Sequence, residues 1–206
     1  MKKHAVIAAL IAAGAVTALA PEASAQVNGG AERDGVRLRG GVSLGGGPLV
    51  PFGLSTAAST GAMGALSVRF GVQFFHAFGI YAQSMNSIGG LGFVTTSGDV
   101  AAYAMAQSYN SLLASLTIAH FLELAAGPSF DYMMFFGCNS AMANCGSGEG
   151  MALGGHLRGS LNFGGLISGG PRRMAFNVGL DLHPTFFLAN RGGFFSAALT
   201  IGVEFF

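Results

Sequence analysis

The sequence contains very little charge. Asp, Glu, Lys and Arg make up 9% of its 206 residues, whereas a soluble domain draws about a quarter of its residues from these types. Both lysines lie among the first three residues, and the chain from residue 26 onward carries eight arginines and eight acidic residues. A net charge near zero and the lack of a basic cluster argue against nucleic acid as a partner.

Long hydrophobic runs are also missing after the first 25 residues. No later segment has 18 consecutive apolar residues, which excludes a membrane-spanning helix in that part of the chain. The 34 glycines follow no period of three and form no low-complexity tract. Neither a collagen-like chain nor plain disorder therefore fits this composition.

Residues 1–25 have the pattern of a secretory signal peptide. Two lysines precede an apolar run over residues 5–20, and Ala-Ser-Ala follows at 23–25. This order predicts cleavage after Ala25. The alternative is an uncleaved anchor, but the run is rich in Ala and shorter than the ~20 strongly apolar residues of a membrane span.

The segment 66–75, LSVRFGVQFF, alternates apolar with polar or small residues. In a strand, Leu66, Val68 and Phe70 share one face, and Ser67 and Arg69 share the other. The chain contains no convincing amphipathic helix, and most of its alternating segments have the ~9 to 11 residues that a tilted strand needs to cross a bilayer. Eight segments alternate in this way: 36–45, 62–74, 78–86, 109–119, 122–133, 151–163, 173–184 and 194–206.

The connections between these segments fall into two sets. Those after the second, fourth and sixth segments are short, and most of the others are longer and rich in Gly, Ser, Asn and Ala. Short turns at one end and long loops at the other are typical of outer-membrane barrels, in which the short turns are periplasmic. We therefore predict an all-β protein over residues 35–206, an eight-stranded antiparallel up-and-down transmembrane β-barrel, after a short tail at 26–34.

The two faces of the predicted strands differ in character. One face is aliphatic and aromatic without charge, and the other mixes polar, charged and glycine residues. A soluble sandwich or lipocalin-like barrel would bury the aliphatic face, whereas a membrane barrel exposes it to lipid. Glycine on the polar face, as a narrow lumen requires, and aromatics near segment ends favour the membrane barrel. The predicted interior charge network comprises Arg37, Arg39, Arg69, Glu123, Asp131, His156, Arg158, Asp181 and Glu204.

The chain ends in LTIGVEFF. Phe205 and Phe206 resemble the terminal signal that the bacterial barrel assembly machinery reads. Together with the topology and the alternation, this ending makes the chain similar to small eight-stranded outer-membrane barrels of the outer-membrane protein A, X and W type. The resemblance implies a Gram-negative outer membrane, with lipid and the assembly machinery as partners.

Function remains open after this resemblance. Such barrels serve as anchors, as adhesion or stress-linked surface proteins, as small channels for apolar solutes and, in a few cases, as lipid A enzymes, so the fold alone does not decide among these roles.

The predicted interior charges need partners. A buried charge is costly unless it is paired and hydrogen-bonded, so a matched network would fill the lumen and plug the barrel. The alternative is a narrow or gated pore lined by the same charges. The expected pairs are Arg37 or Arg39 with Glu204, joined by Glu123, and Arg158 and His156 with Asp131 and Asp181.

Catalysis is a weaker interpretation of the same face. Ser129, Asp131, His156, Asp181 and His183 are predicted there, toward the loop end, and a serine nucleophile needs a base within hydrogen-bond reach. However, the sequence has no GxSxG elbow and no HExxH pattern. We therefore predict no enzyme activity, no cofactor and no metal.

Cys138 and Cys145 are the only cysteines and flank a short predicted loop. In an exported protein such a pair predicts a disulfide, and a two-Cys metal site would lack further ligands.

The functional prediction is a structural or surface-interaction protein with a plugged polar interior. Its binding surface would lie in loops such as 85–108, which are rich in small and apolar residues. The alternative is a narrow channel for small or apolar solutes, which would enter through the wall or the loop mouth.

Overall fold

The structure is a computed structural model. It describes residues 36–53, 57–74, 77–94, 100–119, 121–138, 145–163, 174–188 and 192–205, all within the compact unit that begins at Val36. The predicted signal peptide at 1–25, the tail at 26–34 and Phe206 lie outside these residues. None of the helical structure in the described part of the chain is long and apolar enough to cross a membrane.

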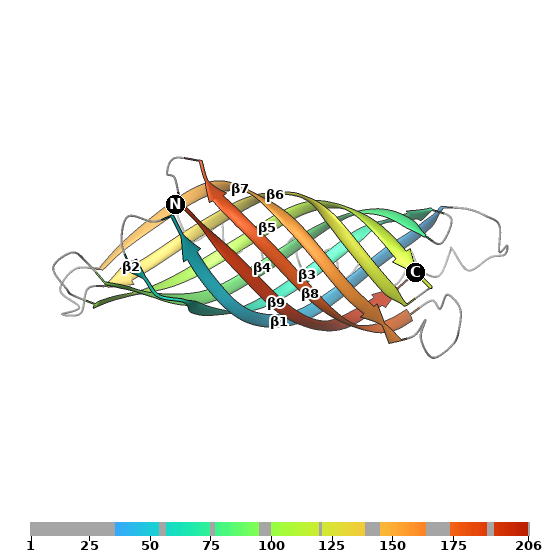
Figure 1. Cartoon of the computed structure of the whole chain (residues 1–206), viewed down its shortest axis with the longest axis horizontal. Coiled ribbons are helices and arrows are strands. Elements are labelled where there is room, and N and C mark those ends of the chain that lie inside the picture. The colour runs from blue at the N-terminus through green and yellow to red at the C-terminus, as the bar shows by residue number, and fades with distance from the viewer. Residues whose placement is uncertain are drawn as a thin grey trace, which may run out of the picture. The chain divides into compact units, whose positions relative to one another are not determined.

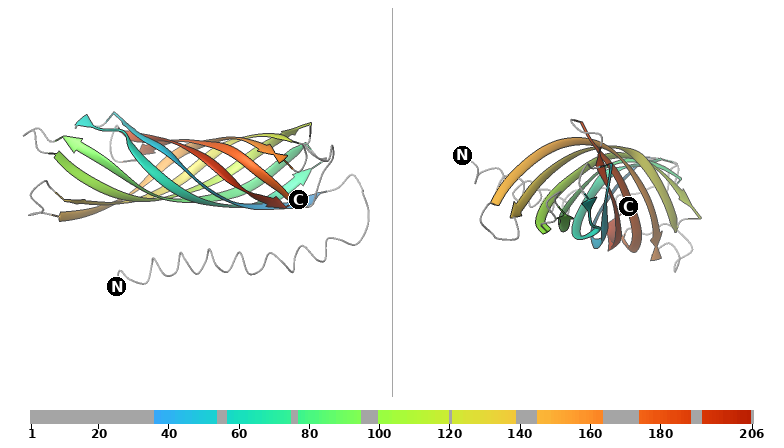
Figure 2. Two further views of the ribbon diagram at one scale, coloured as in Figure 1. Left: turned by 90° about the horizontal axis from the view of Figure 1, so that it is seen from below. Right: turned by 60° about the vertical axis from the view of Figure 1, so that its left-hand side comes forward.

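The described chain forms one closed antiparallel sheet. Eight long strands pair in the order β4-β3-β1-β9-β8-β7-β6-β5, and pairing of β4 with β5 closes the barrel, which confirms the predicted architecture. Figures 1 and 2 show the strands running obliquely around a common axis. The strands are β1 (Arg37–Phe52), β3 (Gly61–Phe74), β4 (Phe78–Val94), β5 (Val100–Ile118), β6 (Leu122–Cys138), β7 (Cys145–Asn162), β8 (Met174–Phe187), β9 (Gly193–Phe205) and the short β2 (Ala57–Ala58) on the edge of β4.

Several strands are longer at the loop end than the sequence predicts. The predicted extent of the loop at 85–108 is wrong, because β4 and β5 pair without a break from Met85 with Tyr109 to Val94 with Val100. The error has a physical reason. Gly, Ser and Ala dominate this stretch and give weak side-chain alternation, but backbone hydrogen bonds between strands form whatever the side chain is.

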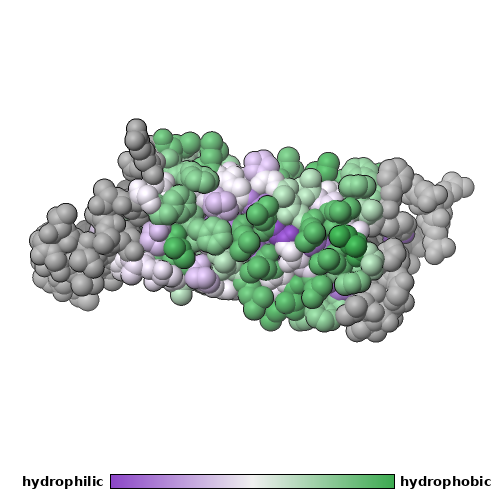
Figure 3. Space-filling model, viewed as in Figure 1, coloured by the Kyte–Doolittle hydropathy of each residue, from purple (hydrophilic) through white to green (hydrophobic). Residues whose placement is uncertain are grey.

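Side chains alternate between the lumen and the outer surface along every long strand. Arg69 is 5% exposed and the adjacent Phe70 is 54% exposed, so the charged face lies inside. Figure 3 shows apolar side chains over much of one outer face, most densely toward the end where β9 finishes. An exposed aliphatic band around a polar lumen is the arrangement that a lipid environment stabilises.

The lumen is divided along its length into two halves. The half near the short turns holds the buried ion pairs, and we call it the polar half. The half near the loops is lined by buried apolar side chains, and we call it the apolar half: Leu49, Met63, Ala65, Met85, Leu91, Met105, Tyr109, Met133, Phe194 and Ala198, with Phe135 and Phe187 packed against them. Buried polar side chains such as Ser87, Gln107, Asp131 and Thr185 lie between these apolar ones, so the interior is polar near the short turns and mixed near the loops.

Candidate functional site: the charged lumen

Two arginines and two glutamates form an ion network nearest the short turns. Arg39 of β1 donates from Nη2 to Glu123 of β6 and, at 2.7 Å, to Glu204 of β9. Arg69 of β3 contacts Glu204 and lies 3.8 Å from Glu123. The hydroxyl of Tyr81 on β4 donates to Glu123 at 2.5 Å. All five side chains are buried, and two positive charges face two negative ones.

This network crosses the lumen. β1 and β6 are four positions apart in the closed sheet of eight, and they therefore stand on opposite walls. The Arg39–Glu123 contact joins these walls directly.

Inward glycines make room for the long charged side chains. A Cβ at Gly41 would lie 3.0 Å from Cγ of Glu204 and 3.4 Å from Nε of Arg69. A Cβ at Gly179 would lie 2.8 Å from Nη2 of Arg158. Glycine at these two positions therefore lets the guanidinium groups pack against the wall.

A second cluster lies further along the polar half, around Asp181 of β8. His156 Nε2 is 2.8 Å from Oδ1 of Asp181, and Arg158 Nη1 is 2.5 Å from Oδ2. Gln83 of β4 also donates to Oδ1 of Asp181, at 3.1 Å. β4 and β8 are again four positions apart, so a second polar bridge joins opposite walls.

Asp131 does not join this cluster, contrary to the prediction. It opposes Ala152 on β7, whereas Arg158 opposes Ala125 on β6, six residues or roughly 20 Å further along the strands. Asp131 instead accepts a hydrogen bond from Thr185 at 2.7 Å. Within the described part of the chain it makes no ion pair.

Arg37, the other candidate partner of Glu204, lies half-buried at the first position of β1, where it opposes Gln73. Sequence reasoning did not assign Tyr81 and Gln83 as partners of the charged groups. The alternation of the sequence places both side chains on the inward face, and this was the available signal. Alternation does not show which group across the lumen each side chain reaches.

Ser111, His156 and Asp181 form a chain that superficially resembles a catalytic triad. Ser111 Oγ lies 2.9 Å from Nδ1 of His156, whose Nε2 contacts Asp181. The predicted Ser129 is not part of this chain. All three side chains are buried, and Asp181 is also bound by Arg158 and Gln83. These three residues therefore offer no exposed nucleophile.

Two imidazole rings, tilted by 38° to each other, lie where the two halves meet. The His183 ring lies 4.0 Å from the His156 ring and 4.4 Å from the Tyr109 ring, measured between centroids. No group of three or more potential metal ligands gathers among the described residues.

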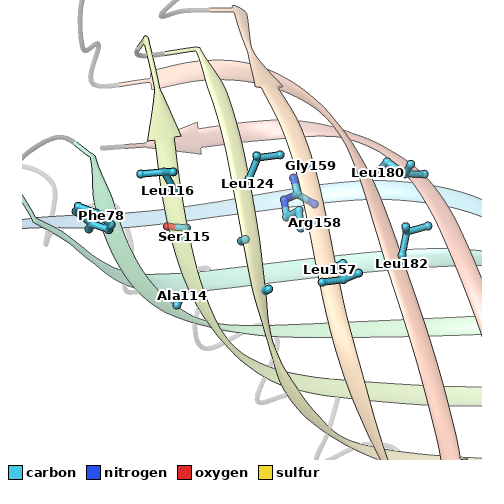
Figure 4. Close-up of a pocket in the computed structure, with 12 residues that line it drawn as sticks. Phe78, Ala114, Ser115, Leu116, Leu124, Leu157, Arg158, Gly159, Leu180 and Leu182 are labelled. Carbon is cyan, nitrogen blue, oxygen red and sulfur yellow. The ribbon is translucent and has the colours of Figure 1, made fainter.

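A depression of about 540 Å³ spans β4 to β8 (Figure 4), and its lining includes the lumen-facing Ser115 and Arg158 as well as outward leucines. Leu116, Leu124, Leu157 and Leu180 surround it, and small residues such as Gly159 stand between them. These residues are typical of a surface that contacts lipid acyl chains.

Cys138 and Cys145 are directly opposed on β6 and β7. Opposed positions of antiparallel strands have Cα atoms about 4.5 to 5.5 Å apart, which suits a disulfide. The two side chains lie outside the described ones, and the disulfide stays a prediction.

The closed sheet, the aliphatic outer band and the buried side chains of the lumen define the fold of a small eight-stranded outer-membrane β-barrel. Ail, the attachment invasion locus protein of Yersinia pestis, has a similar structure, with a TM-score of 0.56 and 9% identity over 81% of this chain and 98% of Ail. Ail in complex with the heparin analogue sucrose octasulfate gives a TM-score of 0.55 and 10% identity, over 82% and 99%.

OprG from Pseudomonas aeruginosa is less similar, with a TM-score of 0.47 and 13% identity over 82% of this chain and 94% of OprG. No protein-family model and no curated protein matches the sequence. At these identities the similarity shows the fold alone.

Proposed function

We propose that the protein is a non-conducting outer-membrane barrel with a structural or surface-interaction role, exerted through its loop end. The observation that carries this proposal is the pair of polar bridges across the lumen, Arg39 to Glu123 and Gln83 to Asp181. Small eight-stranded barrels have an interior just wide enough for side chains. Side chains that meet from opposite walls support a lumen without a continuous water path for ions.

The loop end is nearly neutral. Within residues 50–60, 88–106, 134–151 and 186–194 the charged residues are Asp99, Glu149 and Arg191. A polyanion such as the heparin analogue bound by Ail would find one basic residue there. The small and apolar composition instead favours a neutral partner, or none, at this surface.

Single-channel recording tests the plugged lumen. The chain from Gln26 is refolded and reconstituted into a planar bilayer, and compared with an Arg39→Ala, Glu123→Ala variant that removes one charge of each sign. We expect a silent wild type and a leaky variant, with Glu149→Gln as a silent control. Steady conductance of the wild type would overturn the proposal.

Epitope tags test the orientation. A tag inserted within 139–144 should bind antibody on intact cells, and a tag within 167–171 should bind only after permeabilisation. The reverse pattern would place the short turns outside.

A channel for apolar solutes is the second candidate, and one feature of the wall favours it. In the described strands, the pairing of β5 with β6 skips Leu112 and Leu113 beside Pro128, and the pairing of β7 with β8 skips Gly155 and His156 beside Pro184. Proline lacks the N–H that a ladder needs. Entry of an apolar dye into liposomes that contain the protein, reduced by Pro128→Val, would support this candidate.

A further inference from the structure

Four polar side chains face outward in the middle of β4 and β5. Ser84 on β4 opposes Asn110 on β5, and Asn86 opposes Ser108. We call these four residues the polar patch. On the other long strands, the outward polar side chains that the structure describes are Tyr132 and Glu149, which hydrogen-bond to each other at 2.6 Å.

The patch interrupts apolar rows that run around the wall. Directly opposed outward residues follow one another from strand to strand, and the Ser and Asn residues occupy the same two strands in both rows. Along β4, the exposed Ile80 and Ile88 lie on either side of the patch. The first row is Val203, Val42, Val68, Ser84, Asn110, Phe130 and Leu153, and the second is Ile201, Leu44, Leu66, Asn86, Ser108, Tyr132 and Met151.

Only part of the patch is satisfied within the barrel. Ser84 donates to Oδ1 of Asn110 at 3.0 Å, and Nδ2 of Asn110 donates to Ser108 at 3.2 Å and to the carbonyl of Phe130 at 3.4 Å. Among the described residues, the exposed carboxamide of Asn86 has no hydrogen-bond partner. Lipid tails offer no donors or acceptors, and an unsatisfied polar group among them is costly.

The chemistry of the patch fits a copy of itself. Carboxamides and hydroxyls both donate and accept, so a two-fold axis brings matching groups together in an isologous interface. Small side chains allow the walls of two membrane proteins to approach closely. The outward small residues next to the patch are Ala82 and Ala106, and Gly90 and Ala114 follow beyond Ile88 and Leu112.

We propose that the protein associates in the membrane with a second copy of this chain through the Ser84–Asn86–Ser108–Asn110 face of β4 and β5. This proposal rests on the membrane placement of the barrel but not on a plugged lumen. A conducting barrel would leave it intact.

Cysteine cross-linking in phosphatidylcholine vesicles tests the interface. In a Cys138→Ser, Cys145→Ser background, Ala106→Cys places a thiol beside the patch. Ala197→Cys places a matched thiol outward on β9, four strands away on the opposite wall. On oxidation, we expect covalent dimers with Ala106→Cys and monomers with Ala197→Cys.

The patch itself is tested by adding Asn86→Leu and Asn110→Leu to the Ala106→Cys protein. Leucine matches the neighbouring rows, and loss of two amides should weaken association by about 10- to 30-fold. Dimers at both cysteine positions, dimers at neither, or dimers that persist in the leucine variant would each overturn the proposal. The proposal would also be overturned if, on oxidation in cells, the Ala106→Cys protein cross-linked to a different envelope protein and formed no dimer with itself.

A milder variant covers the case in which the leucine variant fails to fold. Asn86→Ala removes the carboxamide that has no hydrogen-bond partner among the described residues. It leaves the described hydrogen bonds within the patch intact. Folding is checked by the shift in gel mobility between heated and unheated samples. A folded Asn86→Ala protein should form fewer dimers than the wild-type patch, and an unchanged yield would contradict the role of Asn86.

Discussion

The polar and apolar halves of the lumen fill the same barrel by different physical means. In the polar half, charged side chains from opposite walls meet in fixed pairs, as Arg39 does with Glu123. In the apolar half, methionines such as Met85, Met105 and Met133 fill the space with flexible, polarizable side chains. The comparison teaches that side chains in a lumen can be held by specific pairing or by adaptable packing, and the two should respond differently to substitution.

The largest expected effect is a loss of stability on substitution of Asp181, compared with the same substitution at Asp131. Both aspartates are buried, but they have different partners. Asp181→Asn leaves Arg158 without its carboxylate and weakens the contact to His156. Breaking a buried pair in this way costs about 3 to 5 kcal/mol. Asp131→Asn, which keeps the acceptor for Thr185 and removes no ion pair within the described residues, should change stability by less than about 1 kcal/mol.

Urea unfolding of the refolded protein in phosphatidylcholine vesicles, followed by circular dichroism because the chain has no tryptophan, measures both variants. Equal losses for Asp181→Asn and Asp131→Asn would show that burial alone, and not pairing, determines the contribution of a carboxylate in this lumen.

The two halves also differ in how well the sequence predicts them. In the polar half, inward residues such as Arg69 and Asp181 contrast with outward Phe70 and Leu180, so parity is visible in the sequence. In the apolar half, inward Met133 and outward Met134 are the same residue type, and the contrast disappears. Because this contrast is weak, the sequence did not predict the loop-side ends of β4 and β5 as strand.

The sequence predicts only some of the side-chain contacts that cross the lumen. Barrel closure placed β1 beside β9 and so predicted that an arginine near the start of the chain meets Glu204. Contacts between opposite walls, such as Gln83 with Asp181, depend on the stagger of the strands, which side-chain alternation does not encode. The same missing stagger explains the wrong placement of Asp131 beside Arg158.

An intermediate effect is expected in the apolar half. Met133→Ala removes a fully buried side chain from the lumen, and such truncations cost about 2 to 5 kcal/mol. The flexible methionines around it can partly refill the space, which favours the lower end of this range. Met134→Ala changes the adjacent outward position and should cost less than about 1 kcal/mol in the same urea experiment. A larger loss for Met134→Ala would place the packing interface on the wrong side of β6.

The smallest effect concerns the loop end of the apolar half, where Cys138 and Cys145 are opposed on β6 and β7. A disulfide there would close a loop of only a few residues between strands that are already paired. Because the stabilisation grows with the length of the closed loop, we expect a Cys138→Ser, Cys145→Ser protein to lose less than about 2 kcal/mol. Mass spectrometry after alkylation should detect no free thiol in the oxidised wild type and one in Cys138→Ser. Two alkylated cysteines in the wild type would contradict the bridge, and backbone pairing alone would then hold the β6–β7 hairpin together above the apolar half.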